Sequence, residues 1–90
     1  MNMSLFTLIL SEISTHTSSQ FKGWCIGITQ DMLDWSAYGD HAHTFRSWDA
    51  DTLKTAETIK HFLIDLGMTD CTPTTPLLPG KQTYVYIFKK

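Results

Sequence analysis

The sequence predicts a small α+β domain in which helices cover a mostly antiparallel sheet of about three strands. Two segments, 23–29 and 83–88, alternate apolar side chains with other residues as β-strands do. Between these segments, one stretch repeats apolar residues at helical spacings of three and four. The 90 residues, 42% hydrophobic and 18% charged, suffice for a single core. We therefore expect one domain over residues 1–90.

The first expected element is a helix over about 4–13. Apolar residues recur at helical spacing from Leu5 to Ile13, and Ser4 is a suitable N-cap. The same dense apolar run also fits a buried strand, although we favour the helix. Ser14–Gln20 is rich in Ser and Thr and is expected to form a loop.

A strand over 23–29 follows, with two contrasting faces. Alternation places large apolar side chains on one face, namely Trp24, Ile26 and Ile28. The other face carries small side chains, namely Cys25, Gly27 and Thr29. Small side chains make a poor core but a suitable floor for a cleft.

Two short elements are expected in the middle of the chain. A helix over about 32–38 is predicted to begin after Asp31 and to stop at Gly39. Thr44–Trp48 is compatible with a short strand.

The helical periodicity is clearest over about 52–66, where Asp49 or Asp51 is the expected N-cap and Gly67 the stop. The stretch Thr69–Gly80 contains all three prolines and is expected to be a loop. The strand over 83–88 closes the domain and should pair with 23–29, with the long helix packed on both.

Charge and cysteine content narrow the classes of function. Seven Lys and Arg against nine Asp and Glu give a net charge of −2, and Arg46 is the single arginine. This balance disfavours tight, nonspecific binding to duplex DNA. Two cysteines do not form a disulfide scaffold, which predicts a reducing, cytoplasmic setting. The apolar run Leu5–Leu10 is too short for a membrane span.

Several short motifs occur in a recognisable order along residues 21–90. They are Trp24-Cys25-Ile26-Gly27-Ile28-Thr29, Asp40-His41, Arg46, Ala56 through Gly67, Tyr84-Val85-Tyr86 and Lys89-Lys90. This ordered set resembles the GIY-YIG nuclease-like superfamily, and within it small phage and bacterial proteins. The resemblance implies a GIY-YIG-like fold and, in active members, phosphodiester hydrolysis with one divalent metal.

The resemblance also implies catalytic positions, and most of them are altered in this chain. The family's strand tyrosine falls on Cys25, and its helix arginine on Trp35 or Ser36. The metal-binding glutamate falls on Lys60, which reverses the charge at that place. His41 matches the family's histidine. The resemblance thus predicts a degenerate site without confident catalytic residues.

We therefore expect a binding or interaction module, encoded by a phage or mobile element, with no cofactor and no enzymatic activity. The expected cleft is lined by Trp24, Cys25, Thr29, His41, Arg46 and Lys60. The many aromatic residues and the charge balance are compatible with a protein partner or a nucleic acid.

Alternative functions use other residues. A weak, Mg²⁺-dependent endonuclease would use Glu57 as a displaced metal ligand, with His41 and Arg46. Size and charge also fit an acidic inhibitor of a host nucleic-acid-binding protein. Two other sites have weaker support. A zinc site would use His41 and His43 with the adjacent Asp40 and with Cys71 as a fourth ligand, but nothing in this spacing is characteristic of zinc sites. A thiol nucleophile would pair Cys25 with His41, but no third group to orient the histidine is evident.

Overall fold

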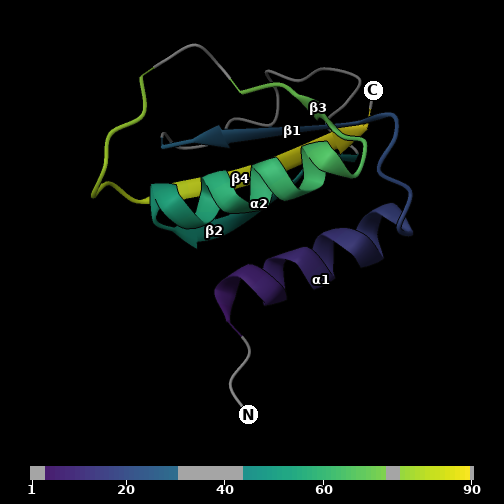
Figure 1. The fold of residues 1–90 in the computed structure, drawn as a ribbon, viewed down its shortest axis with the longest axis horizontal. Coiled ribbons are helices and arrows are strands. Elements are labelled where there is room, and N and C mark those ends of the chain that lie inside the picture. Colours follow the sequence, from purple (N-terminus) through teal and green to yellow (C-terminus); the bar gives the residue numbers. More distant parts are fainter. Residues whose placement is uncertain (1–3, 31–43, 73–75, 90) are drawn as a thin grey trace.

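Two helices pack on a four-stranded mixed sheet (Figure 1). The computed structural model describes residues 4–30, 44–72 and 76–89. The elements are α1 (Leu5–Thr17), β1 (Trp24–Thr29), β2 (Arg46–Asp51), α2 (Leu53–Asp65), β3 (Thr69–Asp70) and β4 (Thr83–Lys89). The strand order is β2-β4-β1-β3. The predicted α+β class is confirmed, with four strands rather than about three.

The centre of the sheet is β4, which pairs antiparallel with β1 on one side and β2 on the other. The register with β1 runs from Trp24 opposite Lys89 to Thr29 opposite Tyr84. This is the pairing that the two alternating segments predict. It brings together the first strand and the last, so the domain is closed by contacts far apart in the sequence.

The core lies between one face of this sheet and the two helices. Fully buried side chains come from both helices and from alternate strand positions, namely Ile9, Ile13, Ile26, Ile28, Ala56, Ile59, Leu63, Val85 and Ile87. The apolar residues that recur at helical spacing in α2 are therefore the ones that are buried, as the sequence predicts. Within the described part of the chain, neither helix has the length and apolar character needed to cross a bilayer.

The first helix is longer than expected, because α1 continues to Thr17 instead of ending near Ile13. The Thr17 hydroxyl donates to the Ile13 carbonyl oxygen at 3.0 Å, so a side chain typical of loops is satisfied within the helix. Ser18 adopts a left-handed conformation with φ 56° and ends the helix. The expected loop over Ser14–Gln20 is therefore wrong in its first half.

The N-cap of α2 is Thr52, not Asp49 or Asp51 as the sequence suggested. The Thr52 hydroxyl oxygen accepts from the Thr55 N–H at 3.2 Å. Both aspartates belong to the irregular end of β2, where the Asp51 N–H donates to the Asp49 carboxylate at 2.8 Å. The Asp49 carboxylate therefore accepts a hydrogen bond at the bulged end of β2 and does not cap the helix.

Two further differences concern the connecting segments. The short strand β3 lies in the stretch expected to be a loop, and it pairs in parallel with Cys25 and Ile26. The Cys71 N–H extends this pairing to the Ile26 carbonyl oxygen at 2.8 Å. β2 begins at Arg46 and ends at Asp51, later than the expected strand at Thr44–Trp48. The helix expected over 32–38 lies outside the described residues.

Gly27 allows a close approach of Tyr86 across the sheet face that lies opposite the helices. A Cβ atom at Gly27 would overlap the Tyr86 ring. The ring is 1% exposed, it stacks on Phe45 with centroids 5.6 Å apart, and its hydroxyl donates to the Cys71 carbonyl oxygen at 3.2 Å. The small residue that the sequence suggested as a cleft floor is thus covered by a phenol.

We expect Gly27→Ala to lower the free energy of unfolding by about 1–3 kcal/mol, because the added methyl group overpacks against the Tyr86 ring. Urea denaturation measures the change. The control is the same substitution in a Tyr86→Leu background, where the ring is absent and the extra methyl group should cost much less. An equal cost in both backgrounds would show that the ring contact is not the reason for the glycine.

A candidate binding groove between α1 and β2

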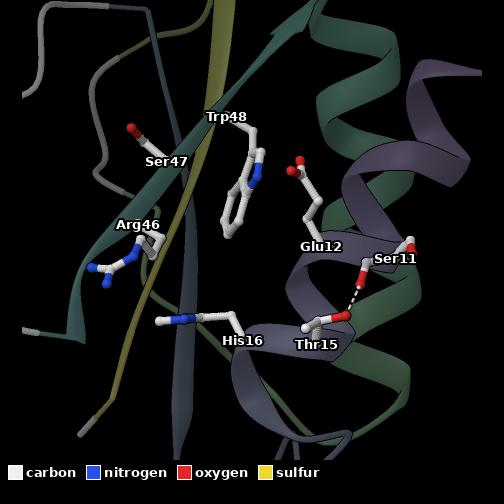
Figure 2. A pocket seen from close by; sticks show the side chains of 7 residues that line it. All are labelled: Ser11, Glu12, Thr15, His16, Arg46, Ser47 and Trp48. Carbon is white, nitrogen blue, oxygen red and sulfur yellow. Dashed lines mark hydrogen bonds between the residues drawn. The ribbon is translucent and has the colours of Figure 1, made fainter.

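A hollow of about 410 Å³ lies between α1 and β2 (Figure 2). One wall comes from successive turns of α1 and the other from the start of β2. The lining residues are Ser11, Glu12, Thr15 and His16 on the helix, and Arg46, Ser47 and Trp48 on the strand. Among these lining residues, Arg46 alone belongs to the cleft that the sequence predicted.

The helical wall is fixed by His16, in the last turn of α1. Its Nε2 atom lies 3.3 Å from the Thr44 carbonyl oxygen, just before β2. Its ring also packs edge-on against Trp24, with centroids 5.3 Å apart. His16 therefore ties the end of α1 to both neighbouring strands. Glu12, one turn earlier, carries its carboxylate at the other end of the hollow (Figure 2).

The strand wall depends on the alternation of β2. Arg46 and Trp48 lie on the helix-facing side, because their cross-strand partners Ile87 and Val85 belong to the core. Ser47 points to the other side (Figure 2). Trp48 is half-buried against the core, beside the carboxylate of Glu12 (Figure 2). The exposed Arg46 side chain donates one N–H to its neighbour's backbone, the Phe45 carbonyl oxygen, at 2.7 Å.

A second hollow of about 360 Å³ adjoins the first and shares His16 with it. Its other lining residues are Thr17, Ser18, Gln20, Lys22, Trp24 and Lys89. Lys22 and Lys89 are exposed. Lys89 lies beyond Arg46 along the sheet, since its N–H donates to the Thr44 hydroxyl at 3.0 Å. We call the two hollows together the α1–β2 groove.

The charges of the α1–β2 groove are unevenly distributed along it. The cationic side chains Arg46, Lys22 and Lys89 gather around His16 at one end. Glu12 is the one acidic side chain among the described lining residues, and it lies beside Trp48 at the other end. The groove therefore offers an aromatic end with one carboxylate and a basic end with several donors.

Of the predicted cleft residues, the structure brings Trp24 and Arg46 to the α1–β2 groove but places Cys25 and Lys60 on opposite sides of the sheet. Cys25 is buried on the sheet face opposite the helices, because its neighbours Trp24 and Ile26 point into the core. Lys60 belongs to α2, on the helical side. The expectation that these two side chains share a concavity is therefore wrong, since the sheet separates them. Thr29 lies on the same face as Cys25 by alternation.

The other predicted site residues are dispersed or undescribed. Trp24 lies in the core and contributes to the second hollow. His41, Trp35, Ser36 and His43 lie outside the described residues. Across residues 4–30, 44–72 and 76–89, no three His, Cys, Asp or Glu side chains are placed to share a metal ion. Glu57, the proposed displaced ligand, is exposed on α2.

Lys60, at the position where the family resemblance places a metal ligand, forms an ion pair with Asp70. Its Nζ atom lies 3.4 Å from an Asp70 carboxylate oxygen at the end of β3. Partial burial acts to raise the pKa of Asp70, but hydrogen bonds from the Thr72 N–H and hydroxyl, together with the Lys60 ammonium, outweigh it. The pKa of Asp70 is therefore lowered from its ordinary value of 3.8. The ion pair links α2 to the edge strand β3.

Sequence reasoning missed the helical wall of the groove because it assigned His16 to a loop. The signal was present in the spacing of Glu12 and His16, which lie four residues apart and share one helix face once the helix continues to Thr17. The strand wall was partly found through Arg46. Comparisons with protein-family models, with curated proteins and with solved structures find no match to this chain.

We expect Asp70→Asn to lower the stability at pH 7 by less than about 1 kcal/mol, because the carboxylate is 48% exposed and its ion pair is screened by solvent. A carboxylate with a lowered pKa stabilises the fold above its ordinary pKa, and the contribution is lost as the pH falls through the folded value. The difference between the natural chain and the variant should therefore vanish in strong acid. Urea denaturation across the acid range measures it.

The matched control is Asp65→Asn, which removes an exposed carboxylate from the last turn of α2. A negative charge is unfavourable at a helix C-terminus, so this variant should lose no stability at pH 7. Equal losses in the two variants would contradict a specific role of the pair between Lys60 and Asp70.

Proposed function

We propose that this chain is a non-enzymatic binding module and that the α1–β2 groove receives a protein partner. The observation that carries the proposal is the adjacency of the two hollows around His16, with Trp48 at one end and cations at the other. Tryptophan and arginine are among the side chains that most often dominate binding energy at protein interfaces. In this groove they stand on successive positions of one face of β2.

A protein partner fits the charges of the groove better than a nucleic acid. Nucleic-acid binding draws on many phosphate contacts from Lys and Arg, each releasing counterions. The basic end offers three such side chains, Arg46, Lys22 and Lys89, while Glu12 lines the same groove and would repel phosphate. The net charge of −2 adds to this repulsion. A protein can present charges of both signs at matching positions.

We propose further that the chain is a catalytically degenerate member of the GIY-YIG nuclease-like superfamily. We also propose that a phage or mobile element encodes it. One observation favours lost catalysis over an active nuclease. Lys60, at the position that the resemblance assigns to the metal-binding glutamate, forms an ion pair with the Asp70 carboxylate, so this carboxylate is already neutralised by an ammonium. The separation of Cys25 and Lys60 by the sheet does not fit the transfer of the family's catalytic positions onto both residues. We propose accordingly that the protein works without a metal cofactor.

We expect no cleavage of supercoiled plasmid or labelled single strands by the purified protein with Mg²⁺ or Mn²⁺. An ammonium at the metal position repels the cation that would polarise the phosphoryl oxygen. A nicking assay with Glu57→Ala and Lys60→Glu variants alongside measures the rate. Metal-dependent nicking by the natural chain that disappears in Glu57→Ala would establish the endonuclease alternative instead.

We expect affinity capture from an extract of the cells that make the protein to depend on the groove. Arg46→Glu should reduce partner retention by about tenfold or more, because it reverses a charge at the basic end. The matched control is Lys54→Glu, the same charge change at an exposed position on α2 outside the groove. Retention by the control should equal that of the natural chain, and treatment of the extract with nuclease should leave it unchanged.

Two results of this experiment would contradict the proposed function. Equal loss in Arg46→Glu and Lys54→Glu would show that net charge, and not the groove, governs capture. Loss after nuclease treatment would show that a nucleic acid occupies or bridges the site.

A further inference from the structure

We infer that the partner enters the α1–β2 groove as an extended peptide segment that pairs antiparallel with β2 and places acidic side chains at the basic end. This inference rests on the proposed function and deepens it by naming the form and the chemistry of the partner. Four features support it: the open edge of β2, the bulge that limits this edge, the helix beside it and the order of the charges along the groove.

The edge of β2 is available for a further strand. Within the described residues, β2 pairs with β4 alone and is the outermost strand of the sheet. Alternate residues of an edge strand direct their N–H and C=O groups away from the sheet, where they can pair with another chain. The first hollow touches the consecutive residues Arg46, Ser47 and Trp48, whose side chains alternate between faces. This places part of the hollow at the strand edge rather than over one face.

The length of the open edge is limited at its far end. The register with β4 shifts between Asp49 and Asp51, and Asp51 has φ 67°. The Asp49 carboxylate also accepts from the side chain of Gln82 and from the Asp51 N–H. Such a bulge ends regular pairing and protects an edge from unlimited association. The segment Arg46–Asp49 therefore remains for a short peptide strand.

The helix beside the edge favours a single peptide strand over a second copy of the sheet. α1 contacts β2 and α2, and it forms the opposite wall of the hollow (Figure 2). An extended peptide fits between an edge strand and a helix, with backbone pairing on one side and side-chain contacts on the other. A second copy of β2 would bring its own α1 to the same place, so two helices would compete for the space beside the paired edges.

A segment antiparallel to β2 meets the charges of the groove in a defined order. An antiparallel segment begins beside Asp49 and Trp48 and ends beside Arg46, then continues over the second hollow towards Lys22 and Lys89. Its first residues meet Glu12 and the Trp48 indole, which suit an apolar or basic side chain. Its last residues meet four potential donors, which suit carboxylates. The first half of the expected peptide therefore alternates apolar or basic side chains with other residues, as a strand does, and its second half carries acidic side chains.

The test is a selection on the purified full-length chain with a random octapeptide library displayed by its C-terminal end, so that acidic side chains rather than a terminal carboxylate are sampled. We expect enriched peptides to carry Asp or Glu after a stretch of strand-forming residues. The probe for all later measurements is the most enriched peptide, synthesised with a fluorescent label, and its affinity is measured by anisotropy.

Charge variants test the basic end of the groove. Arg46→Glu and Lys22→Glu should each weaken binding of this peptide by about tenfold or more, and Lys54→Glu should change it by less than about twofold. Circular dichroism establishes that each variant is folded, which is expected because all three side chains are exposed. Binding that is equal in Arg46→Glu and in the natural chain would overturn the inference.

Backbone methylation of the peptide tests the strand pairing itself. Methyl groups on alternate peptide nitrogens remove N–H donors without changing any charge. In an antiparallel pair, one alternate set of N–H groups faces β2 and the other faces away. One methylated peptide should therefore lose binding and the other should keep it. Equal effects of the two sets would show that the peptide does not add as a strand.

Other occupants of the groove give distinct results, and each would overturn the inference. One is enrichment of no peptide, or of peptides without acidic residues. A second is a dimer in light scattering that the enriched peptide does not dissociate, which would indicate a second copy at β2. A third is binding of a labelled single-stranded oligonucleotide to the natural chain, if this binding is lost in Arg46→Glu. If capture from the cell extract depends on Arg46 while no peptide binds, the proposed function stands and this inference fails. If capture does not depend on Arg46, both fail.

Discussion

The position of β4 between β1 and β2 is the constraint on which the rest of the structure depends. A strand with neighbours on both sides has its backbone groups paired along its length. Val85 and Ile87 face the helices, while Tyr86 is buried on the other face. Because β4 fills the centre, neither β1 nor β2 can complete its pairing before β4 is in place. Such long-range closure makes the fold depend on non-local contacts.

The groove follows from this arrangement. With β4 in the centre, β2 becomes an edge strand, and α1 packs beside α2 and β2, with His16 also in contact with Trp24 of β1. The helix therefore lies over the margin of the sheet, where His16 joins its last turn to the backbone before β2 and to Trp24. A helix held at a margin leaves a hollow between itself and the strand edge. The packing of α1 beside β2 thus contributes to the core and also forms the groove.

The sequence predicted those parts of the fold whose pattern is local and repeated. The alternation around Ile26 and the spacing of Ile59 and Leu63 record burial directly, so β1, β4 and α2 were found. It failed at α1 and at β3 for different reasons. The last turn of α1 is built from Ser and Thr residues whose hydroxyls bond within the helix, so local hydrogen bonds override a loop-like composition, whereas β3 is a two-residue strand defined entirely by its partner. The predicted cleft was wrong because the helices cover the apolar face of β1, which places Lys60 on the side of the sheet opposite Cys25.

Local charge, and not net charge, decides what the groove can select. The chain is acidic overall, with a net charge of −2, yet Arg46, Lys22 and Lys89 gather around His16. Charges separated by more than a Debye length of about 10 Å are largely screened, so carboxylates elsewhere on the surface weaken this basic end little at physiological salt. They do repel polyanions, whose charge extends over long distances. A short acidic segment avoids that repulsion while still meeting the basic end, and Glu12 at the other end opposes the reversed orientation. A groove with a basic end and one carboxylate, in a chain of net charge −2, therefore favours partners that are both small in cross-section and asymmetric in charge.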